Sequence, residues 1–290
     1  MNTSAFCGKT VLVTGASRGL GQEISEAFWR RGADLLLVAR SGEILSALCA
    51  RLACTRHETQ RVVHFVNDLS DPDAPALIFD ALQSFTGRID VLVNNAAIIG
   101  PIGPLDGNDW PGWKSAIDVN LLAPAALCRL AIPRMKSQGG GAIVNLSGGG
   151  ATSPRPFFSA YAAAKAGLVR LTENIAAEVG RYGVRANAIA PGAMNTEMHN
   201  AVLRAGPALA GETEYRKALE QAERGGVPYA TAAELAVFLA SDAAAGINGK
   251  LISAVWDPWK NLGKHAAELA KSDVYTLRRI VPEDRSFLWD

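Results

Sequence analysis

Residues Thr10–Gly21 read TVLVTGASRGLG, and this stretch decides the fold class. The apolar run Thr10–Thr14 has the composition of a buried strand and leads straight into a glycine-rich turn, which a helical pattern follows. In such a turn Gly15 permits the tight bend, Gly19 lets backbone amides approach a pyrophosphate, and Gly21 allows close helix–strand packing. Because the triplet joins a first strand to a first helix, it predicts a dinucleotide-binding loop and not a purely structural turn.

Outward from this loop, strand-like and helix-like patterns alternate over most of the chain. Short runs rich in Val, Ile and Leu predict strands at 10–14, 34–39, 62–66, 91–94, 142–146, 184–190 and 250–254. Segments of helical period predict helices at about 20–31, 43–54, 74–85, 110–136, 159–181 and 231–241. Continuous apolar strands suit a parallel sheet that is buried on both faces. The sequence therefore predicts an α/β, doubly wound, Rossmann-type fold, with a seven-stranded parallel sheet in a three-layer αβα arrangement.

No internal repeat or Pro/Ser-rich linker divides this pattern, so we expect one catalytic domain over residues 1–255. Residues 193–228 interrupt the alternation after the sixth strand. Because ligands bind beyond the carboxyl ends of parallel strands, this segment is expected to be a substrate lid, with Tyr215 and Arg216 among its contacts. Residues 256–290 carry apolar side chains that should not stay solvated, so this extension is expected to pack on the domain or on a partner subunit.

The composition excludes several classes of function. The 290 residues carry 29 basic and 28 acidic side chains, a net charge of +1, which favours neither nucleic acid nor a membrane surface. No apolar run has the length of a membrane span, and the four cysteines include no CxxC pair. The four histidines lack the spacing of metal ligands. We expect a cytoplasmic protein with no metal, no nucleic acid and no membrane partner.

The end of the second strand predicts which dinucleotide binds. An acidic residue there would accept hydrogen bonds from the ribose hydroxyls of NAD, but Val38, Ala39 and Arg40 include none. Arg40 and Arg18 instead offer two guanidiniums that suit a 2′-phosphate, although both could be solvated surface residues. NADP is therefore the expected cofactor, and NAD is the less favoured one.

Short motifs elsewhere in the chain resemble those of the short-chain dehydrogenase/reductase family in its simple single-domain form. They are TGASRGLG at 14–21, NDL at 67–69, NNAA at 94–97, Asn120, YAAAK at 161–165 and PGAMNT at 191–196. The resemblance covers about residues 9–254 and departs mildly at Ala97, where the family often has glycine. It implies an enzyme that assembles as a homodimer or homotetramer through the helix at 159–181, whose small residues allow close approach.

The resemblance also implies a set of cofactor contacts. They are Gly15, Ser17, Arg18, Gly19, Leu20 and Gly21 in the loop, Arg40 after the second strand, Asp68 and Leu69 at the adenine, Asn95 and Ala96 at the ribose, Pro191, Gly192, Met194 and Thr196 at the nicotinamide, and Tyr161 and Lys165.

Tyr161 and Lys165 are four residues apart in a helical segment, so they share one helix face. A phenol with a pKa of about 10 is a poor acid–base catalyst at neutral pH, and a lysine ammonium one turn away is expected to lower that pKa. By resemblance, Tyr161 exchanges the proton at the substrate oxygen and Lys165 also binds the nicotinamide ribose.

Asn120 precedes Pro124 by four residues in the same expected helix. Pro124 has no amide hydrogen, so the Asn120 carbonyl should lose its intrahelical donor and can hold an ordered water. The resemblance implies a proton relay from this water through Lys165. A simple proline kink is the alternative interpretation.

The catalytic serine is displaced from its usual position. The family places this serine 13 residues before the tyrosine, which is Gly148 here, and Ser147 is one residue earlier. Either the glycine-rich stretch shifts the register and Ser147 donates to the substrate oxygen, which we expect, or this donor is missing. Residues 154–158 should form the wall that faces the lid.

The expected function is NADP-dependent interconversion of a secondary alcohol and a ketone on a small-molecule substrate, with Tyr161 as acid/base. Two alternatives stay open. Gly148 alone favours a catalytically impaired dinucleotide-binding regulator or scaffold. An oxoacyl-thioester reductase would need a basic surface for an acidic carrier, which the net charge does not decide.

Overall fold

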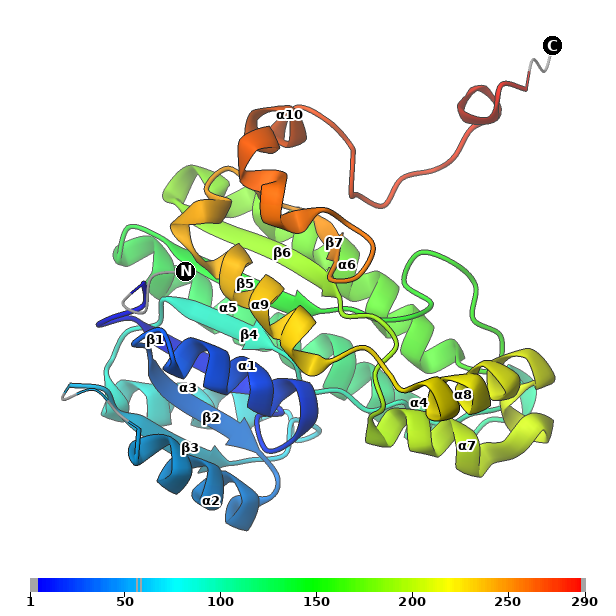
Figure 1. Ribbon diagram of the computed structural model, residues 1–290, viewed down its shortest axis with the longest axis horizontal. Coiled ribbons are helices and arrows are strands. Elements are labelled where there is room, and N and C mark those ends of the chain that lie inside the picture. Colours follow the sequence, from blue (N-terminus) through cyan, green and yellow to red (C-terminus); the bar gives the residue numbers. More distant parts are fainter. Residues whose placement is uncertain (1–4, 56, 58, 288–290) are drawn as a thin grey trace.

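A computed structural model describes residues 5–55, 57 and 59–287; the outermost ends of the predicted domain and extension, 1–4 and 288–290, lie outside them. Seven parallel strands form one sheet in the order β3-β2-β1-β4-β5-β6-β7 (Figure 1). They are β1 Thr10–Thr14, β2 Asp34–Ala39, β3 Val62–Val66, β4 Val91–Asn94, β5 Gly141–Leu146, β6 Val184–Ala190 and β7 Leu251–Ser253. The predicted doubly wound fold is confirmed, and the strand order reverses between β1 and β4.

Helices cover both faces of the sheet, as predicted (Figure 1). They are α1 Gly19–Trp29, α2 Gly42–Ala53, α3 Ala74–Phe85, α4 Trp110–Ile117, α5 Ala123–Ser137, α6 Ser159–Val179, α7 Glu197–Ala210, α8 Glu212–Arg224, α9 Tyr229–Ala240 and α10 Ala266–Ala270. Buried side chains of α1, α2 and α9 share one core cluster with one face of the sheet, and those of α3, α5 and α6 share a second cluster with the other face.

The central strands are apolar throughout because each face has its own core. In β1, Val11 and Val13 belong to the cluster beneath α1, and Leu12 belongs to the opposite cluster. The edge strand β3 departs from the expectation of burial on both faces, since Val66 is 51% exposed. An edge position leaves one side of this strand without a neighbouring strand, so its burial is incomplete.

The helix predicted at 110–136 contains a π-helical segment, η2 Asp118–Leu122, between α4 and α5. In η2 the Ala123 amide donates to the Asp118 carbonyl, five residues back, next to the position where Pro124 removes a donor. The segment Trp110–Ser137 is long enough to span a bilayer and contains an 18-residue window with a mean hydropathy of 1.4. In this fold it is a core helix, since Leu127 and Met135 are fully buried against the sheet.

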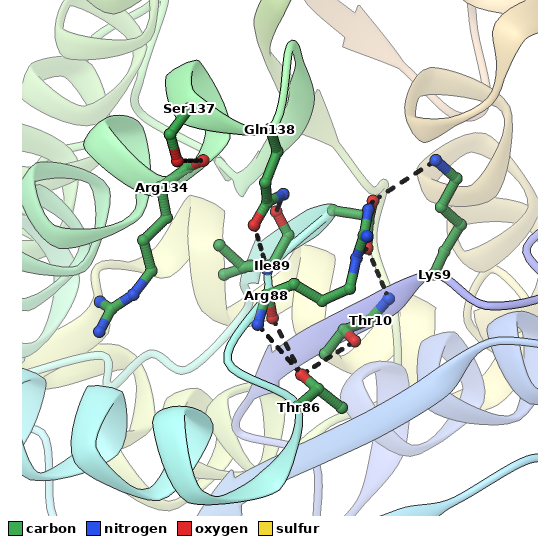
Figure 2. Close-up of polar contacts among 9 residues, drawn as sticks. Lys9, Thr10, Thr86, Arg88, Ile89, Arg134, Ser137 and Gln138 are labelled. Atoms are coloured by element: carbon green, nitrogen blue, oxygen red, sulfur yellow. Dashed lines mark hydrogen bonds and ion pairs between the residues drawn. The ribbon is translucent and has the colours of Figure 1, made fainter.

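A polar cluster joins the amino-terminal ends of β1 and β4, at the opposite edge of the sheet from the carboxyl ends of the strands (Figure 2). The Asp90 carboxylate accepts a hydrogen bond from the Thr10 amide at 2.8 Å, and it forms ion pairs with Arg88 at 2.6 Å and Lys9 at 3.4 Å. Burial raises the pKa of Asp90, but the hydrogen bonds from Arg88 and Thr10 outweigh burial and hold this pKa below its ordinary value.

Candidate active site

A cleft of about 1270 Å³ opens at the carboxyl ends of the strands, across the switch point between β1 and β4. Every residue that the sequence analysis assigned to the cofactor or to catalysis lines this cleft, except Asn120. The volume exceeds the roughly 300–1,000 Å³ of ordinary small-molecule pockets. It therefore has room for a dinucleotide together with a substrate. Over the part of the chain that the structure describes, no group of three or more His, Cys, Asp or Glu side chains could hold a metal ion.

Two glycines of the loop, Gly15 and Gly21, leave no space for a side chain. Gly15 has φ +64°, and a Cβ there would lie 2.8 Å from the Cα of Ala96, while a Cβ at Gly21 would overlap the Gly15 carbonyl. The Asn95 side-chain amide braces the turn by donating to two of its carbonyl oxygens, at 3.0 and 3.2 Å. Because α1 begins at Gly19, the free amides of its first turn lie next to the loop. These features fit a pyrophosphate.

Two exposed guanidiniums line the end of the cleft near β2. Arg40 pairs with Asp68 at 3.9 Å, with side chains that are 68% and 48% exposed, and Arg18 lies in the glycine loop. An ion pair this exposed and this long holds its partners weakly. Arg40 is therefore free to exchange Asp68 for a ligand phosphate, which fits the 2′-phosphate of NADP.

One face of α6 carries Tyr161 and Lys165, both buried. The Lys165 Nζ donates to the Leu146 carbonyl at the end of β5, at 2.7 Å, and lies 5.7 Å from the centre of the Tyr161 ring. Burial lowers the pKa of Lys165 to about 8, so the ammonium form still predominates at neutral pH.

The expectation of a lowered pKa for Tyr161 is wrong for this structure. Burial raises the pKa of Tyr161, and the cation that opposes this effect is Arg155. The Lys165 ammonium is directed at the Leu146 carbonyl instead. The sequence places Lys165 one turn from Tyr161, but it does not say where the ammonium points or how deeply the phenol is buried.

Ser147 and Gly148 follow β5 and lie beside Tyr161. A Cβ at Gly148 would overlap the Tyr161 hydroxyl, so position 148 faces the phenol directly and the tyrosine fills the space a side chain would need. The Ser147 Oγ is buried and has no hydrogen-bond partner among the described residues. An unpaired buried hydroxyl is costly, and an oxygen atom of a ligand would satisfy it.

Asn120 lies behind the cleft and is fully buried in the π-helical segment. Its side-chain oxygen accepts a hydrogen bond from the Ile98 amide at 3.0 Å, and its side-chain nitrogen donates to the Ile98 carbonyl at 2.7 Å. The side chain therefore anchors the segment after β4. The ordered water on its carbonyl stays a prediction.

The segment 193–228 contains two helices that the sequence analysis did not predict, α7 and α8. Thr196 caps α7, because its hydroxyl accepts a hydrogen bond from the His199 amide at 3.3 Å. On α8, the residues that line the cleft are spaced for one helix face: Glu214, Lys217, Ala218 and Gln221. Tyr215 and Arg216 do not line the cleft, which corrects the expectation for these two residues.

The two ends of this segment meet at a narrow neck. The Val227 amide donates to the Ala193 carbonyl at 2.8 Å. Tyr229, the first residue of α9, donates from its hydroxyl to the Asn195 carbonyl, and its ring lies 3.6 Å from where a Cβ of Gly19 would be. Tyr229 therefore joins the neck to the glycine loop. The sequence analysis missed this residue, which no motif marks.

The C-terminal extension is divided between buried and exposed parts. Trp259, Leu262 and Leu269 are buried in the same core cluster as α9. Trp256 lines the cleft but is 85% exposed, contrary to the expectation that its apolar surface would be covered. Residues 278–287 extend away from the body of the molecule (Figure 1) and form what we call the arm.

The chain matches the short chain dehydrogenase family over residues 9–205. D-threitol dehydrogenase of Mycolicibacterium smegmatis is 37% identical over 242 residues, which cover 83% of this chain and 89% of that protein. 3β-Hydroxysteroid dehydrogenase 1 of Eggerthella lenta is 37% identical over 243 residues, covering 83% and 90%.

Solved structures agree with this assignment. The levodione reductase structure has a TM-score of 0.77 and 31% identity over 89% of this chain and 99% of its own. L-Sorbose reductase of Gluconobacter frateurii, complexed with NADPH and L-sorbose, has a TM-score of 0.76 and 26% identity over 87% and 96%.

The protein is therefore an alcohol/ketone oxidoreductase built on a single Rossmann-type sheet, and it belongs to the short-chain dehydrogenase/reductase family. Both the fold and the class of enzyme that the sequence analysis predicted are confirmed.

Proposed function

We propose that the protein interconverts a secondary alcohol and a ketone with NADP(H), and that Tyr161 is the acid/base. The observation that carries this proposal is the buried pair Tyr161–Lys165 in a cleft at the switch point of the sheet. A buried phenol and a buried ammonium beside an open cleft are costly unless a ligand uses them, which favours a catalytic role over a scaffold.

NADP, when bound, supplies the hydride chemistry. The Tyr161 hydroxyl gives its proton to the substrate oxygen during reduction and takes one back during oxidation. The unpaired Ser147 hydroxyl donates a hydrogen bond to the same oxygen, and Lys165 binds the nicotinamide ribose. Asn120 holds the water that returns the proton through Lys165.

Arg18 and Arg40 support NADP over NAD, since both are exposed at the β2 end of the cleft and no carboxylate follows Ala39. A structural relative, L-sorbose reductase, was solved with NADPH, which agrees with this choice. The relatives include a D-threitol dehydrogenase and a 3β-hydroxysteroid dehydrogenase, whose named substrates differ widely. We therefore propose a small-molecule alcohol or ketone as the substrate without naming it.

We also propose one catalytic domain over 1–255, a lid over 193–228 that is mobile without ligand and ordered with it, and an extension over 256–290. The extension packs on the domain through Trp259, Leu262 and Leu269, and its arm reaches a partner subunit. The exposed Ile280 on the arm supports the last point, because an apolar side chain on a projecting segment favours contact with another surface. The assembly would be a homodimer or homotetramer in the cytoplasm.

The test is a panel of ketones assayed with NADPH and with NADH, followed by the absorbance of the nicotinamide. Tyr161→Phe removes only the ionisable oxygen, so turnover should fall by about 10²–10⁴ while NADPH binding, measured by fluorescence titration, is kept. Lys165→Ala should weaken both turnover and binding. Near-normal turnover in Tyr161→Phe would refute the acid/base role, and binding without turnover in the unmodified protein would favour a regulator.

A further inference from the structure

Three consecutive glycines, Gly148–Gly150, bring Arg155 close to Tyr161. A Cβ at Gly148 would overlap the Tyr161 hydroxyl, a Cβ at Gly149 would lie 3.8 Å from Nη1 of Arg155, and one at Gly150 would lie 3.2 Å from the Arg155 Cβ. The phenol and the guanidinium therefore lie on the same short stretch of bare backbone. Both residues line the cleft.

Arg155 is held in place by Glu214 on α8 and by Phe158 in its own segment. Its Nε donates to Oε2 of Glu214 on α8 at 2.9 Å, and each side chain of this ion pair is only 22% exposed. The guanidinium carbon lies 4.0 Å from the centre of the fully buried Phe158 ring. An ion-pair partner and an aromatic partner together restrict the orientation of a guanidinium.

Other charged groups line the same cleft as Tyr161. On its own helix, Lys165 is directed at the Leu146 carbonyl. On α8, Glu214 is shared between Arg155 and Lys217, whose Nζ lies 3.1 Å from it. On α7, the cleft is lined by His199 and by the pair Glu197–Arg204, and the glycine loop contributes Arg18. Of these groups, Arg155 is the cation that counteracts burial of the Tyr161 phenol.

We propose that Arg155 is a positioning residue for the acid–base step: its guanidinium, fixed by Glu214 and Phe158, favours the phenolate form of Tyr161 where position 148 offers no side chain. The inference rests on the proposed function, because it takes Tyr161 as the acid/base. Attraction between the guanidinium and a phenolate is strong in a buried site. Glu214 opposes it, since its carboxylate repels the same phenolate and partly neutralises Arg155.

An electrostatic role of Arg155 predicts that two variants shift the pH profile in opposite directions, which a purely structural role does not predict. Arg155→Gln and Glu214→Gln both break the same ion pair. If Arg155 acts on Tyr161 by its charge, the acid limb of kcat/KM in alcohol oxidation should move up by about one pH unit in Arg155→Gln and down in Glu214→Gln. Arg155→Lys keeps the positive charge, so its acid limb should lie close to that of the unmodified protein. A pair that only fastens α8 to residues 154–158 would give both Gln variants the same rise in KM and an unmoved limb.

A spectroscopic titration tests the same inference without turnover. The ultraviolet absorbance of tyrosinate is measured against pH for the unmodified protein and for the two Gln variants, each with the matching Tyr161→Phe variant subtracted. Opposite displacements of this Tyr161 titration support the inference, and equal or absent displacements overturn it.

If Tyr161→Phe kept its turnover, the proposed function would fail; if that variant were inactive while the titration did not move, only the role of Arg155 would fail. Thermal melting of each variant establishes that it is folded. If Arg155→Gln is not folded, the comparison is made with Arg155→Lys and Glu214→Gln.

Discussion

Two buried polar sites at opposite ends of the parallel sheet differ in whether their side chains have hydrogen-bond partners. At the amino end, the Asp90 carboxylate is satisfied by the Thr10 amide and by two cations (Figure 2). At the carboxyl end, the buried Ser147 hydroxyl has no partner in the described residues, and the Lys165 ammonium, which has three donors, hydrogen-bonds to the Leu146 carbonyl. The Asp90 cluster at the amino end therefore stabilises the fold, whereas Ser147 and Lys165 at the carboxyl end stay available for ligands.

The largest effect that separates the two ends is expected at Ser147. Ser147→Ala should lower kcat by about 10²–10³, the scale for one donor to a developing oxyanion. Its melting temperature should not fall, because the substitution removes a hydroxyl without a hydrogen-bond partner. Steady-state kinetics and calorimetry measure the two effects, with Ser153→Ala, another serine that lines the cleft, as the control. An unchanged kcat would mean that the substrate oxygen has no serine donor.

Asp90→Asn should give the reverse result at the amino end. Loss of the charged hydrogen bonds from Arg88 should lower the free energy of unfolding by about 2 kcal/mol, after allowing for the exposure of Arg88 and Lys9. Activity per folded molecule should stay unchanged. Urea unfolding monitored by fluorescence measures the loss. A fall in kcat of the same size as at Ser147 would remove the distinction between the two ends.

The pH dependence of stability follows from the direction of the Asp90 shift. Because the folded-state pKa lies below the ordinary value of 3.8, the stabilisation by Asp90 is fully present above that value and is lost as the pH falls through the folded-state pKa. The difference in unfolding free energy between the unmodified protein and Asp90→Asn should therefore be constant near neutrality and shrink in acid. A difference that grew toward low pH would contradict the assignment.

Much of the fold was predictable because its signals are local. Each predicted strand agrees with the observed one to within one residue at either end. The glycine loop could be placed for the same reason, since a strand, three glycines and a helix follow one another directly. The π-helical turn was signalled in part by Pro124, although the sequence indicated only a missing donor and not the i→i+5 pattern.

The parts of the site that escaped prediction depend on contacts between distant residues or on depth of burial. Arg155 and Glu214 are 59 positions apart, and nothing in either neighbourhood announces their ion pair. The helices of the lid were hidden by glycines, among them Gly206 and Gly211, whose positive φ values interrupt and separate α7 and α8. The direction of the Tyr161 pKa was wrong because sequence spacing does not report burial.

A smaller effect is expected at the cofactor end of the cleft. Arg40→Asp should reduce the preference for NADPH over NADH by about tenfold, because it replaces a phosphate partner by a carboxylate that repels phosphate and suits ribose hydroxyls. The ratio of kcat/KM for the two cofactors measures it. Arg129→Asp, a substitution at an exposed position outside the cleft, is the control. Equal efficiency with NADH in the unmodified protein would remove NADP from the proposal.

The smallest effect is expected from removing the arm. Truncation after Arg279 deletes a segment that projects from the body of the molecule and includes Ile280, which is 57% exposed, so the free energy of unfolding per chain should change by less than about 0.5 kcal/mol. Sedimentation should instead detect a smaller assembly than that of the full-length chain. A full-length chain that sediments as a monomer at micromolar concentration would refute the proposed partner contact.

The neck between Ala193 and Val227 has a consequence for how this enzyme can diversify. The lid leaves the domain at Ala193 and returns at Val227, and a hydrogen bond joins these two residues. The number of residues between them can therefore change without moving the strands of the sheet. Doubling the length of such a closed loop adds only about 0.6 kcal/mol of closure entropy. The lid is in this sense an exchangeable cassette: insertions, deletions or grafts that keep the Glu214 partner of Arg155 can change which molecules are accepted, while the frame that holds Tyr161 and Lys165 is inherited intact.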